Sequence, residues 1–135
     1  MFLQKTLEYL SGKSLETIVQ EEIFRPLHME NSSFVWRASF ASNAATGHDK
    51  AGCPTAIYKF AEPYAAFSLL TSASDYNRFL QALPIGWGLK PATAQLLLTP
   101  VNAANRCIVP ASPTDASIAW ACGIGLAATS QGPAL

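Results

Sequence analysis

Charge is scarce in this sequence, and long hydrophobic runs are missing. Only 13% of its 135 residues are Asp, Glu, Lys or Arg, and nine basic side chains cancel nine acidic ones. No cluster of Lys and Arg occurs, so the chain has no electrostatic footprint for nucleic acid or an anionic membrane surface. No apolar run approaches the ~20 residues of a membrane-spanning helix. The sequence therefore predicts no nucleic-acid partner and no membrane span.

The first eight residues lack the pattern of a secretory signal. They begin with apolar side chains, but Lys5 and Glu8 interrupt them before a continuous apolar segment can form. The chain as written is therefore expected to be soluble and to carry no export address. Its compartment would follow from a longer parent protein, which could be exported.

Cysteine and histidine are too few and too scattered for a predicted metal centre. Cys53, Cys107 and Cys122 form no Cys-x-x-Cys pair, and His28 and His48 stand twenty residues apart with no acidic pair beside them. No glycine-rich phosphate loop occurs. We expect no metal and no cofactor, and three free, at least partly buried thiols. A single disulfide is the alternative if the parent is exported.

The sequence is long enough for one domain, and half of its residues are hydrophobic. Its patterns are mainly those of helices. Apolar spacing, caps and proline stops predict helices at four places: Met1 to Leu10, Leu15 to Phe24, Ala73 to Leu83 and Pro91 to Leu98. Two strands are expected: Thr55 to Phe60, and Ile118 to Leu126 as one strand whose only local partner is the first. The chain should therefore be mainly α with a minor β component.

The predicted helix boundaries rest on local signals. Gly12 suits the left-handed residue after the first helix, Ser14 is a good N-cap for the second, and Pro26 disfavours helix beyond Phe24. We therefore expect His28 to be a solvent-facing turn residue.

A second set of signals marks the third and fourth helices. Ser72 with Asp75 three residues later is a capping-box-like pair. The third helix should bury Tyr76, Phe79, Leu80 and Leu83. Pro91 should begin the fourth helix, with Leu96 to Leu98 turned inward.

Three stretches share their order and spacing with one known family. From Gly12 the chain reads Gly-Lys-Ser, a helix, and then Ile-Phe-x-Pro-Leu-x-Met-x-x-Ser-Ser-Phe up to Phe34; the other two run from Ala65 to Leu80 and from Pro91 to Pro100. Together they resemble the serine β-lactamase-like proteins, the family of class C β-lactamases, DD-peptidases and related esterases. These relatives often have glycine at the position of His28. The resemblance covers nearly the whole chain.

The catalytic motifs of the resembled family are absent from these residues. Its enzymes use a serine nucleophile in Ser-x-x-Lys, but no serine here stands three residues before a lysine. No Tyr or Ser stands two residues before an asparagine, and neither Lys-Thr-Gly nor His-x-Gly occurs. The family would place the third motif just beyond Pro133. The helix expected from Met1 has no N-cap of its own, so we expect either that the natural start lies upstream or that Met1 was once an internal residue.

The resemblance thus implies a single partial domain over residues 1–135. It would be the helical subdomain of a β-lactamase/transpeptidase-like α+β fold, without the nucleophile segment and the third-motif strand. No catalytic residue is expected in it. In class C-like relatives the position of Phe67 carries an aromatic residue that forms one wall of the substrate pocket, with Ser68 next to it. The alternative is that Phe67 is a core residue.

As a function, the resemblance implies part of a serine hydrolase that transfers an acyl group from a β-lactam, a D-alanyl peptide or an ester, with the fragment inactive alone. A non-catalytic binding or assembly module that keeps the fold is the alternative, and an unrelated all-α interaction domain is a third. The parent's partner would be a small-molecule acyl substrate. We also expect a homodimer through the open strand Ile118 to Leu126 or through the first helix, where Leu3 and Leu7 cannot be covered in so short a chain.

Overall fold

The computed structural model describes residues 2–103, 117–129 and 132–134. The chain divides into two compact units, Met1–Phe79 and Leu80–Leu135. Helix exceeds strand among the described residues, in agreement with the prediction of helices with a small β component. Helix α3 (Ala73–Ala82) crosses the division between the units.

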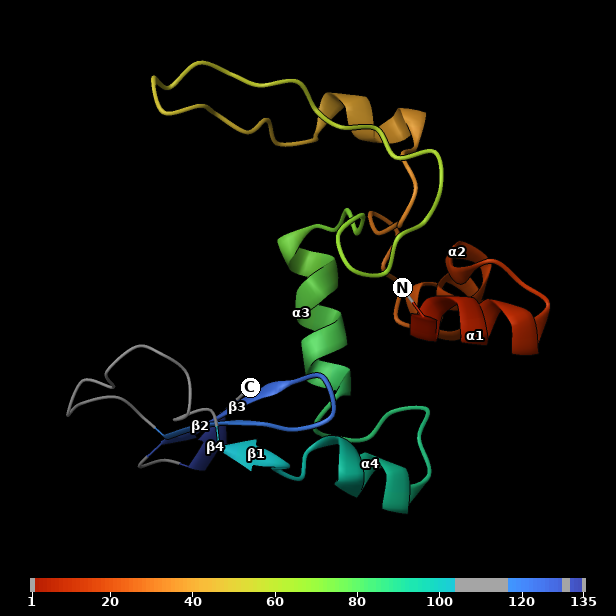
Figure 1. Ribbon diagram of the computed structural model, residues 1–135, viewed down its shortest axis with the longest axis vertical. Helices are drawn as coiled ribbons and strands as arrows, with labels where there is room; N and C mark the ends of the chain where they lie inside the picture. The colour runs from red at the N-terminus through yellow and green to blue at the C-terminus, as the bar shows by residue number, and fades with distance from the viewer. Residues whose placement is uncertain (1, 104–116, 130–131, 135) are drawn as a thin grey trace. The chain divides into compact units, whose positions relative to one another are not determined.

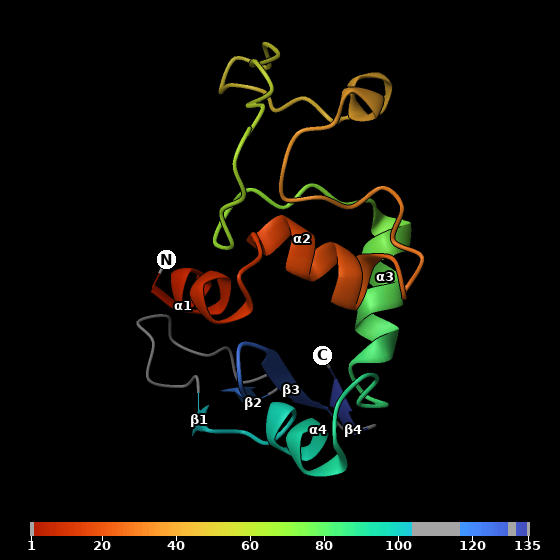
Figure 2. The ribbon, with the colours of Figure 1, turned by 90° about the vertical axis from the view of Figure 1, so that its right-hand side faces the viewer.

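The first unit opens with two helices that contact each other, α1 (Phe2–Ser11) and α2 (Leu15–Val19), seen in Figures 1 and 2. Gly12 has a φ of +66°, the left-handed conformation that closes α1. The Ser14 hydroxyl accepts a 3.2 Å hydrogen bond from the Thr17 amide, which satisfies one free donor of the first turn. Both predicted boundary signals are confirmed.

Helix α2 passes directly into a π-helical turn, Gln20–Phe24, so the predicted helix ends at Phe24 as expected. No sequence feature predicts the wider π geometry. The exposed His28 follows with a φ of +54°. Its predicted place in a solvent-facing turn is confirmed, and the left-handed backbone is one that glycine adopts without strain.

Between residues 37 and 62 the chain runs away from α1 and α2 and returns (Figures 1 and 2). This excursion contains a short 3₁₀ helix, η2 (Ala38–Ser42). The predicted strand from Thr55 to Phe60 is wrong, because the stretch has no regular secondary structure. Among the described residues, no parallel or antiparallel neighbour pairs with its β-prone residues. Its backbone bonds to other segments lie at its ends, from the Thr55 amide to the Gly47 carbonyl (2.8 Å) and from the Trp36 amide to the Phe60 carbonyl (2.7 Å).

Helix α3 starts as predicted, with the Ser72 hydroxyl accepting a 3.2 Å hydrogen bond from the Asp75 amide. The Asp75 carboxylate does not return to the cap. It is fully buried and accepts hydrogen bonds from Asn31 and Ser32 instead. Tyr76 is exposed, so its predicted burial is wrong, because Asp75 takes the inward position beside it. The other three predicted apolar residues of this helix are half-buried.

In the second unit, α4 (Pro91–Leu97) begins at Pro91 as predicted. The preceding turn needs Gly86, which has a φ of +62° and lies so near α4 that a Cβ atom there would come within 2.4 Å of the Ala94 Cβ. Leu96 is exposed rather than turned inward, whereas Leu98 is half-buried. The short helix therefore uses the small Ala94 for its closest approach to the turn.

The second unit also contains an antiparallel sheet in the order β1-β2-β3-β4. Its strands are β1 (Asn102–Ala103), β2 (Ser117–Trp120), β3 (Gly125–Thr129) and β4 (Gly132–Ala134), shown in Figure 1. The single strand predicted from Ile118 to Leu126 is therefore wrong. It is a hairpin, because Gly123 adopts a φ of +83° and turns the chain back on itself. The predicted pairing with the Ile57 region is wrong too, since β2 and β3 pair with each other.

Burial in the first unit is unusual in being largely polar. Its buried apolar side chains are Leu15, Phe24 and Met29, whereas the buried polar ones are Gln4, Ser32, Ser33, Ser68 and Asp75. In the described part of the chain, every buried side-chain nitrogen and oxygen has a hydrogen-bond partner. Polar contacts therefore fix this unit as much as apolar packing does.

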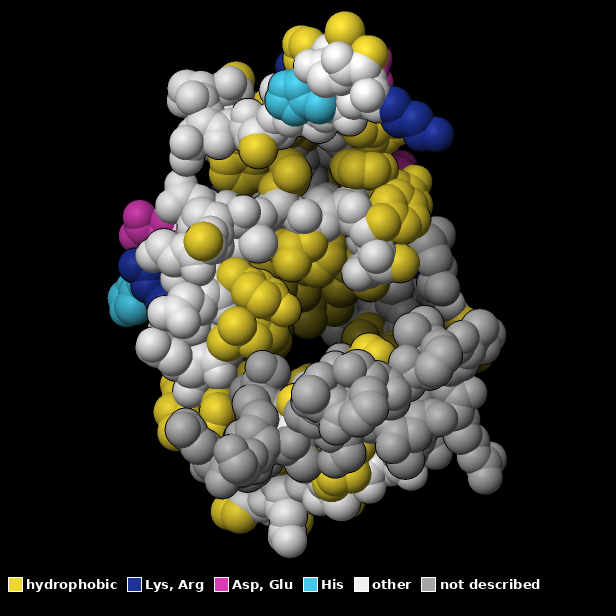
Figure 3. Space-filling model, turned by 90° about the vertical axis from the view of Figure 1, so that its left-hand side faces the viewer, with side chains coloured by type: hydrophobic (Ala, Val, Ile, Leu, Met, Phe, Trp, Pro, Cys, Tyr) yellow, Lys and Arg dark blue, Asp and Glu magenta, His cyan; other side chains and the backbone are white. Residues whose placement is uncertain are grey.

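Hydrophobic side chains are also left uncovered at the surface. Figure 3 shows them over much of one face, with few charged groups among them. On α1 the exposed residues include Phe2, Leu3, Leu7 and Leu10. None of the described helices combines the length and the hydrophobicity that crossing a bilayer requires.

Candidate functional site

The two residues that the sequence marks as a pocket wall lie in one loop, Pro63–Leu70, in opposite environments. Ser68 is 1% exposed and Phe67 is 60% exposed. Phe67 is therefore exposed in the described part of the chain rather than packed in its interior. The loop presents an aromatic ring to solvent while its neighbour anchors the backbone.

Ser68 makes that anchor with its hydroxyl group. The Oγ donates to the Phe34 carbonyl at 2.7 Å and accepts from the Tyr64 amide at 2.8 Å. The first bond ties the loop to the segment after α2, and the second closes the loop on itself. A buried hydroxyl used in this way is a structural group and not a nucleophile, because a nucleophile has to reach substrate and a base.

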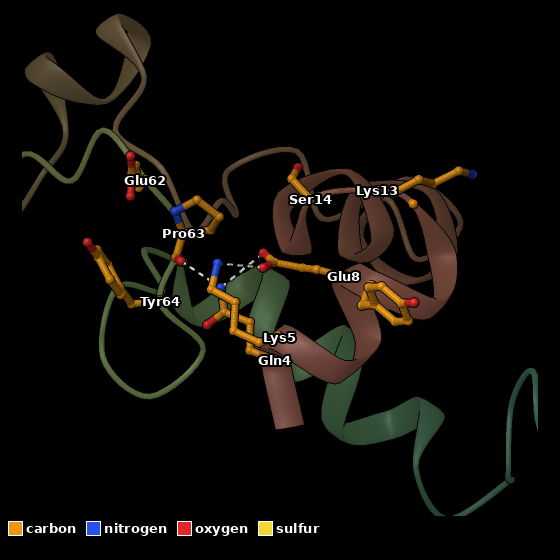
Figure 4. Close-up of a pocket in the computed structure, with 10 residues that line it drawn as sticks. Gln4, Lys5, Glu8, Lys13, Ser14, Glu62, Pro63 and Tyr64 are labelled. Atoms are coloured by element: carbon orange, nitrogen blue, oxygen red, sulfur yellow. Dashed lines mark hydrogen bonds and ion pairs between the residues drawn. The ribbon is translucent and has the colours of Figure 1, made fainter. Parts of the chain in front are cut away.

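Gln4 of α1 holds the start of the loop. Its Nε2 donates to the Pro63 carbonyl at 2.9 Å, and its Oε1 accepts from the Ala65 amide at 3.0 Å. Nε2 also donates to Glu8 at 3.1 Å. Figure 4 shows the Gln4 side chain between Glu8 and Pro63. Sequence reasoning missed Gln4, since a lone polar residue in an amphipathic helix gives no signal of burial.

The end of the loop is held by backbone. Ser33 and Leu70 exchange two hydrogen bonds, of 2.9 and 2.8 Å, in an isolated antiparallel bridge. The loop Pro63–Leu70 is thus fixed at its start by Gln4, in its second half by Ser68 and at its end by Ser33. Such fixing leaves little further entropy to be lost on ligand binding.

Glu16 of α2 in turn fixes the segment that receives the loop. Its carboxylate accepts from the Ser33 hydroxyl and the Phe34 amide, both at 2.7 Å, and pairs with Arg37 at 3.2 Å. Burial acts to raise the pKa of Glu16, but these hydrogen bonds and one from Gln20 outweigh it and hold the pKa below its ordinary value. Glu16 is therefore a charged structural hub of the first unit.

Asp75 holds the other end of the same segment. It accepts from the Asn31 amide at 2.7 Å and the Ser32 hydroxyl at 3.0 Å, and it pairs with Arg78 at 2.7 Å. Two carboxylates from different helices thus clamp residues 31–34, on which the loop Pro63–Leu70 rests. Both carboxylates are engaged in structural hydrogen bonds rather than aimed at a substrate.

Aromatic rings gather around Phe67. It stacks on Tyr64 with ring centroids 5.1 Å apart and an interplanar angle of 12°, and it tilts against Phe60 at 5.4 Å. Phe60 in turn lies 4.4 Å from Tyr58. We call Tyr58, Phe60, Tyr64 and Phe67 the aromatic patch. It is the largest concentration of aromatic rings in the described part of the first unit.

A hollow of about 600 Å³ lies beside the start of the loop, lined by α1, the turn after it and Pro63 (Figure 4). Its polar centre is Glu8, which pairs with Lys5 at 2.8 Å. The hydrogen bonds from Lys5, Gln4 and the Leu15 amide lower the pKa of Glu8 to about 2. A carboxylate with so low a pKa is a poor general base near neutral pH, so Glu8 is not suited to that role.

The remaining candidates for reactive centres are the metal-ligating and thiol side chains. No group of three His, Cys, Asp or Glu side chains that could hold a metal occurs among the described residues. Cys53 and Cys122 are free thiols, as predicted, but both are exposed, because each lies in a surface turn rather than in a packed element. Cys107 lies outside the described residues.

Comparison with known proteins agrees with the sequence motifs. The beta-lactamase family model matches residues 1–120. Among solved structures, the octameric penicillin-binding protein homologue from Pyrococcus abyssi is similar, with a TM-score of 0.65 and 20% identity. The match covers 92% of this chain but only 28% of that one, so the chain spans well under a third of that protein's length. At this identity the likeness shows a shared fold alone.

No curated protein matches the chain. The family match extends over far more than half of the 135 residues and includes all three stretches that carry the resemblance. The chain therefore belongs to the beta-lactamase family.

Proposed function

We propose that residues 1–135 form a single partial domain, the mainly helical portion of a serine hydrolase of the β-lactamase type. The parent activity is acyl transfer to a serine from a β-lactam, a D-alanyl peptide or an ester, followed by hydrolysis. Family membership supports this proposal. So does the penicillin-binding protein homologue, whose fold the chain shares.

Within that enzyme, the role of this chain is to supply one wall of the acyl-substrate pocket. The observation that carries this role is the loop Pro63–Leu70: it is fixed by the buried Gln4 and Ser68, yet it leaves the ring of Phe67 60% exposed. Folding tends to cover aromatic rings, so a rigid loop that exposes one has the form of a preorganised binding surface.

Catalysis itself requires groups that these residues do not contain. The sequence has no Ser-x-x-Lys, no Tyr-x-Asn and no Lys-Thr-Gly or His-x-Gly. Ser68, the serine nearest the exposed ring, donates its proton to the Phe34 carbonyl. The chain alone should therefore bind acyl substrates without turning them over.

The test combines turnover with binding. The chain is incubated with a chromogenic cephalosporin and with a short-chain nitrophenyl ester, and it should hydrolyse neither faster than albumin does. Titration with the cephalosporin should nevertheless shift the amide resonances of Tyr64 to Leu70, and Phe67→Ala should weaken binding. Stoichiometric acylation of a serine, seen by mass spectrometry, would contradict the proposal that this chain binds the substrate without reacting with it. Ligand-induced resonance shifts confined to residues outside the loop would contradict the proposal that the loop forms the pocket wall.

We further infer that the chain self-associates through α1. Phe2, Leu3, Leu7 and Leu10 are all exposed on this helix, and exposed apolar patches of several hundred Å² usually become interfaces. The penicillin-binding protein homologue of similar fold is octameric. We prefer α1 to the alternative route through Ile118 to Leu126, because that stretch is a hairpin whose strand β2 already pairs with β3 and, at Ala119 and Trp120, with β1.

A further inference from the structure

We propose that residues 69–71 bind an extended, uncharged peptide segment of a partner protein, which adds to them as a neighbouring strand. The site is a groove of about 350 Å³, lined by residues 69–72, by residues of the segment 39–45, and by Asn31 and Ile57. We call it the edge groove. Neither Phe67 nor Ser68 lines it, so this inference does not depend on the proposed function.

The first argument is an open backbone edge. Leu70 and Ser33 exchange hydrogen bonds of 2.8 and 2.9 Å, so the amide and the carbonyl of Leu70 both face Ser33. In extended backbone, the polar groups of successive residues point to opposite edges. Those of Leu69 and Thr71 therefore point away from Ser33, and their amides and carbonyls make no hydrogen bond with any described residue. Such an edge is a template for another strand.

The second argument is the space beside this edge. Leu69 and Thr71 both line the edge groove, and Leu69 keeps 38% of its surface exposed. A strand paired with residues 69–71 would lie about 4.8 Å from them, a distance at which the groove can receive its backbone. The small side chains of Ala44 and Ala45 also line the groove and take little of its volume. The open edge therefore faces room for one added chain.

The third argument is the chemistry of the lining. The described side chains that line the groove include no Asp, Glu, Lys, Arg or His. A charged ligand group would lose its hydration there without gaining an opposite charge. Asn31, Ser39 and Asn43 offer neutral hydrogen-bonding groups, and the half-buried Phe40 and Ile57 offer apolar contact. This mixture fits a peptide that alternates apolar and hydroxyl side chains.

The edge is also preformed. Leu70 is held by Ser33, the Thr71 hydroxyl lies 2.8 Å from the Ser32 hydroxyl, and Ser72 caps α3. The backbone that would receive the peptide is therefore fixed before binding, and little conformational entropy is lost when the peptide pairs with it.

The experiment uses the peptide acetyl-Thr-Val-Thr-Val-Thr-amide, which is uncharged and favours an extended backbone. It is titrated into the whole chain, and amide resonances and amide hydrogen exchange are recorded by NMR. The amides of Leu69 and Thr71 should shift and exchange more slowly, because they gain a partner. The amide of Leu70 should change little, because it is already bonded to Ser33.

Two N-methylated analogues test the backbone pairing. One carries methyl groups on the amide nitrogens of both valines, and the other carries them on all three threonines, so each analogue loses the donors of one edge. An added strand pairs through one of its edges only. One analogue should therefore bind about twofold to tenfold more weakly, the range expected for a lost backbone hydrogen bond, while the other keeps the affinity of the parent peptide.

Two variants of the chain test the location. Ala45→Trp places a large side chain in the edge groove and should abolish binding. Ala41→Trp is the matched control, because Ala41 is also exposed and belongs to η2 but does not line the groove, so this variant should bind like the wild type. The amide spectrum of each variant checks that it remains folded.

Several outcomes would overturn the proposal. Absence of binding at millimolar peptide would do so, as would equal changes at Leu69, Leu70 and Thr71, or equal affinities of the two analogues. A peptide with lysine in place of both valines should bind more weakly, and equal binding would contradict the preference for an uncharged segment. If the amides of Leu69 and Thr71 are protected in the free chain and lose protection on dilution, the occupant is a second copy of this chain and the partner peptide is wrong.

Discussion

Glu16 shows most clearly how single residues support the loop with Phe67. Its carboxylate receives hydrogen bonds from Ser33, Phe34, Gln20 and Arg37, and together with Asp75 it determines where residues 31–34 lie. The loop Pro63–Leu70 rests on these residues through the Phe34 carbonyl and the Ser33 backbone. A substitution at Glu16 should therefore alter the position of Phe67 even though the two residues are not in contact.

Acid should destabilise the first unit. The pKa values of Glu8 and Glu16 both lie below the ordinary 4.5, that of Glu8 at about 2. A carboxylate whose pKa is lower in the folded state stabilises the fold above its unfolded pKa and loses that contribution as the pH falls through the folded value. The free energy of unfolding, measured by urea denaturation, should therefore fall from about pH 4.5 towards pH 2. Constant stability over this range would contradict the role of both carboxylates.

Glu16→Gln tests the hub directly. The amide replaces one acceptor oxygen with a donor group that faces existing donors, so it should cost about 1–3 kcal/mol at neutral pH. The variant should also lose part of the acid dependence. Glu22→Gln is the matched control on the same helical segment, where the side chain is exposed and has no described partner. Equal effects of the two substitutions would show that Glu16 is an ordinary surface residue.

At the scale of elements, the turn before α4 depends on Gly86. Gly86→Ala adds a Cβ in a left-handed backbone and within 2.4 Å of the Ala94 Cβ, so strain and overpacking together should cost about 2–4 kcal/mol. Gly88→Ala is the control. Gly88 is also left-handed, with a φ of +72°, but a Cβ added there would meet no other atom within 4 Å, so only the backbone penalty of ~1–2 kcal/mol applies. The melting temperature of Gly86→Ala should lie well below that of Gly88→Ala. The reverse order would contradict the close packing of Gly86 against Ala94.

The helices could be predicted from sequence because their signals are local. Gly12, Ser14 and Pro91 act within one turn of the chain, and the structure uses each as expected. The strands could not be predicted in the same way, because a strand depends on a partner strand that can lie far away in the sequence. Thr55–Phe60 has the composition of a strand but no strand beside it in the described part of the chain. The pattern of Ile118 to Leu126 predicts one strand, whereas in the structure Gly123 turns this stretch into a hairpin.

The candidate site was predictable only in part, for a related reason. Phe67 and Ser68 stand out through the family resemblance, but Gln4, Glu16 and Asp75 act through contacts that span 61, 18 and 44 residues of chain. A polar residue in an amphipathic helix normally faces water. Nothing in the local pattern shows that these three turn inward.

For the whole molecule, the exposed face of α1 leads to a prediction about assembly. Light scattering at micromolar concentration should give a mass above that of the monomer, and replacing both Leu3 and Leu7 with lysine should restore the monomer. Ile85→Lys, which charges an exposed apolar position in the second unit, should leave association unchanged. A wild-type chain that stays monomeric when concentrated would show that α1 is not an interface.

The loop Pro63–Leu70 is the proposed fixed wall for acyl substrates. The most direct test compares cephalosporin binding to the wild-type chain and to Ser68→Ala by NMR. This variant leaves Phe67 in place but removes the hydroxyl that joins Phe34 to Tyr64. We predict that the wild type shows ligand-induced shifts centred on Phe67, and that Ser68→Ala, still folded, binds several-fold more weakly because the wall is no longer held. Unchanged affinity in Ser68→Ala, or shifts confined to other parts of the chain, would contradict the account.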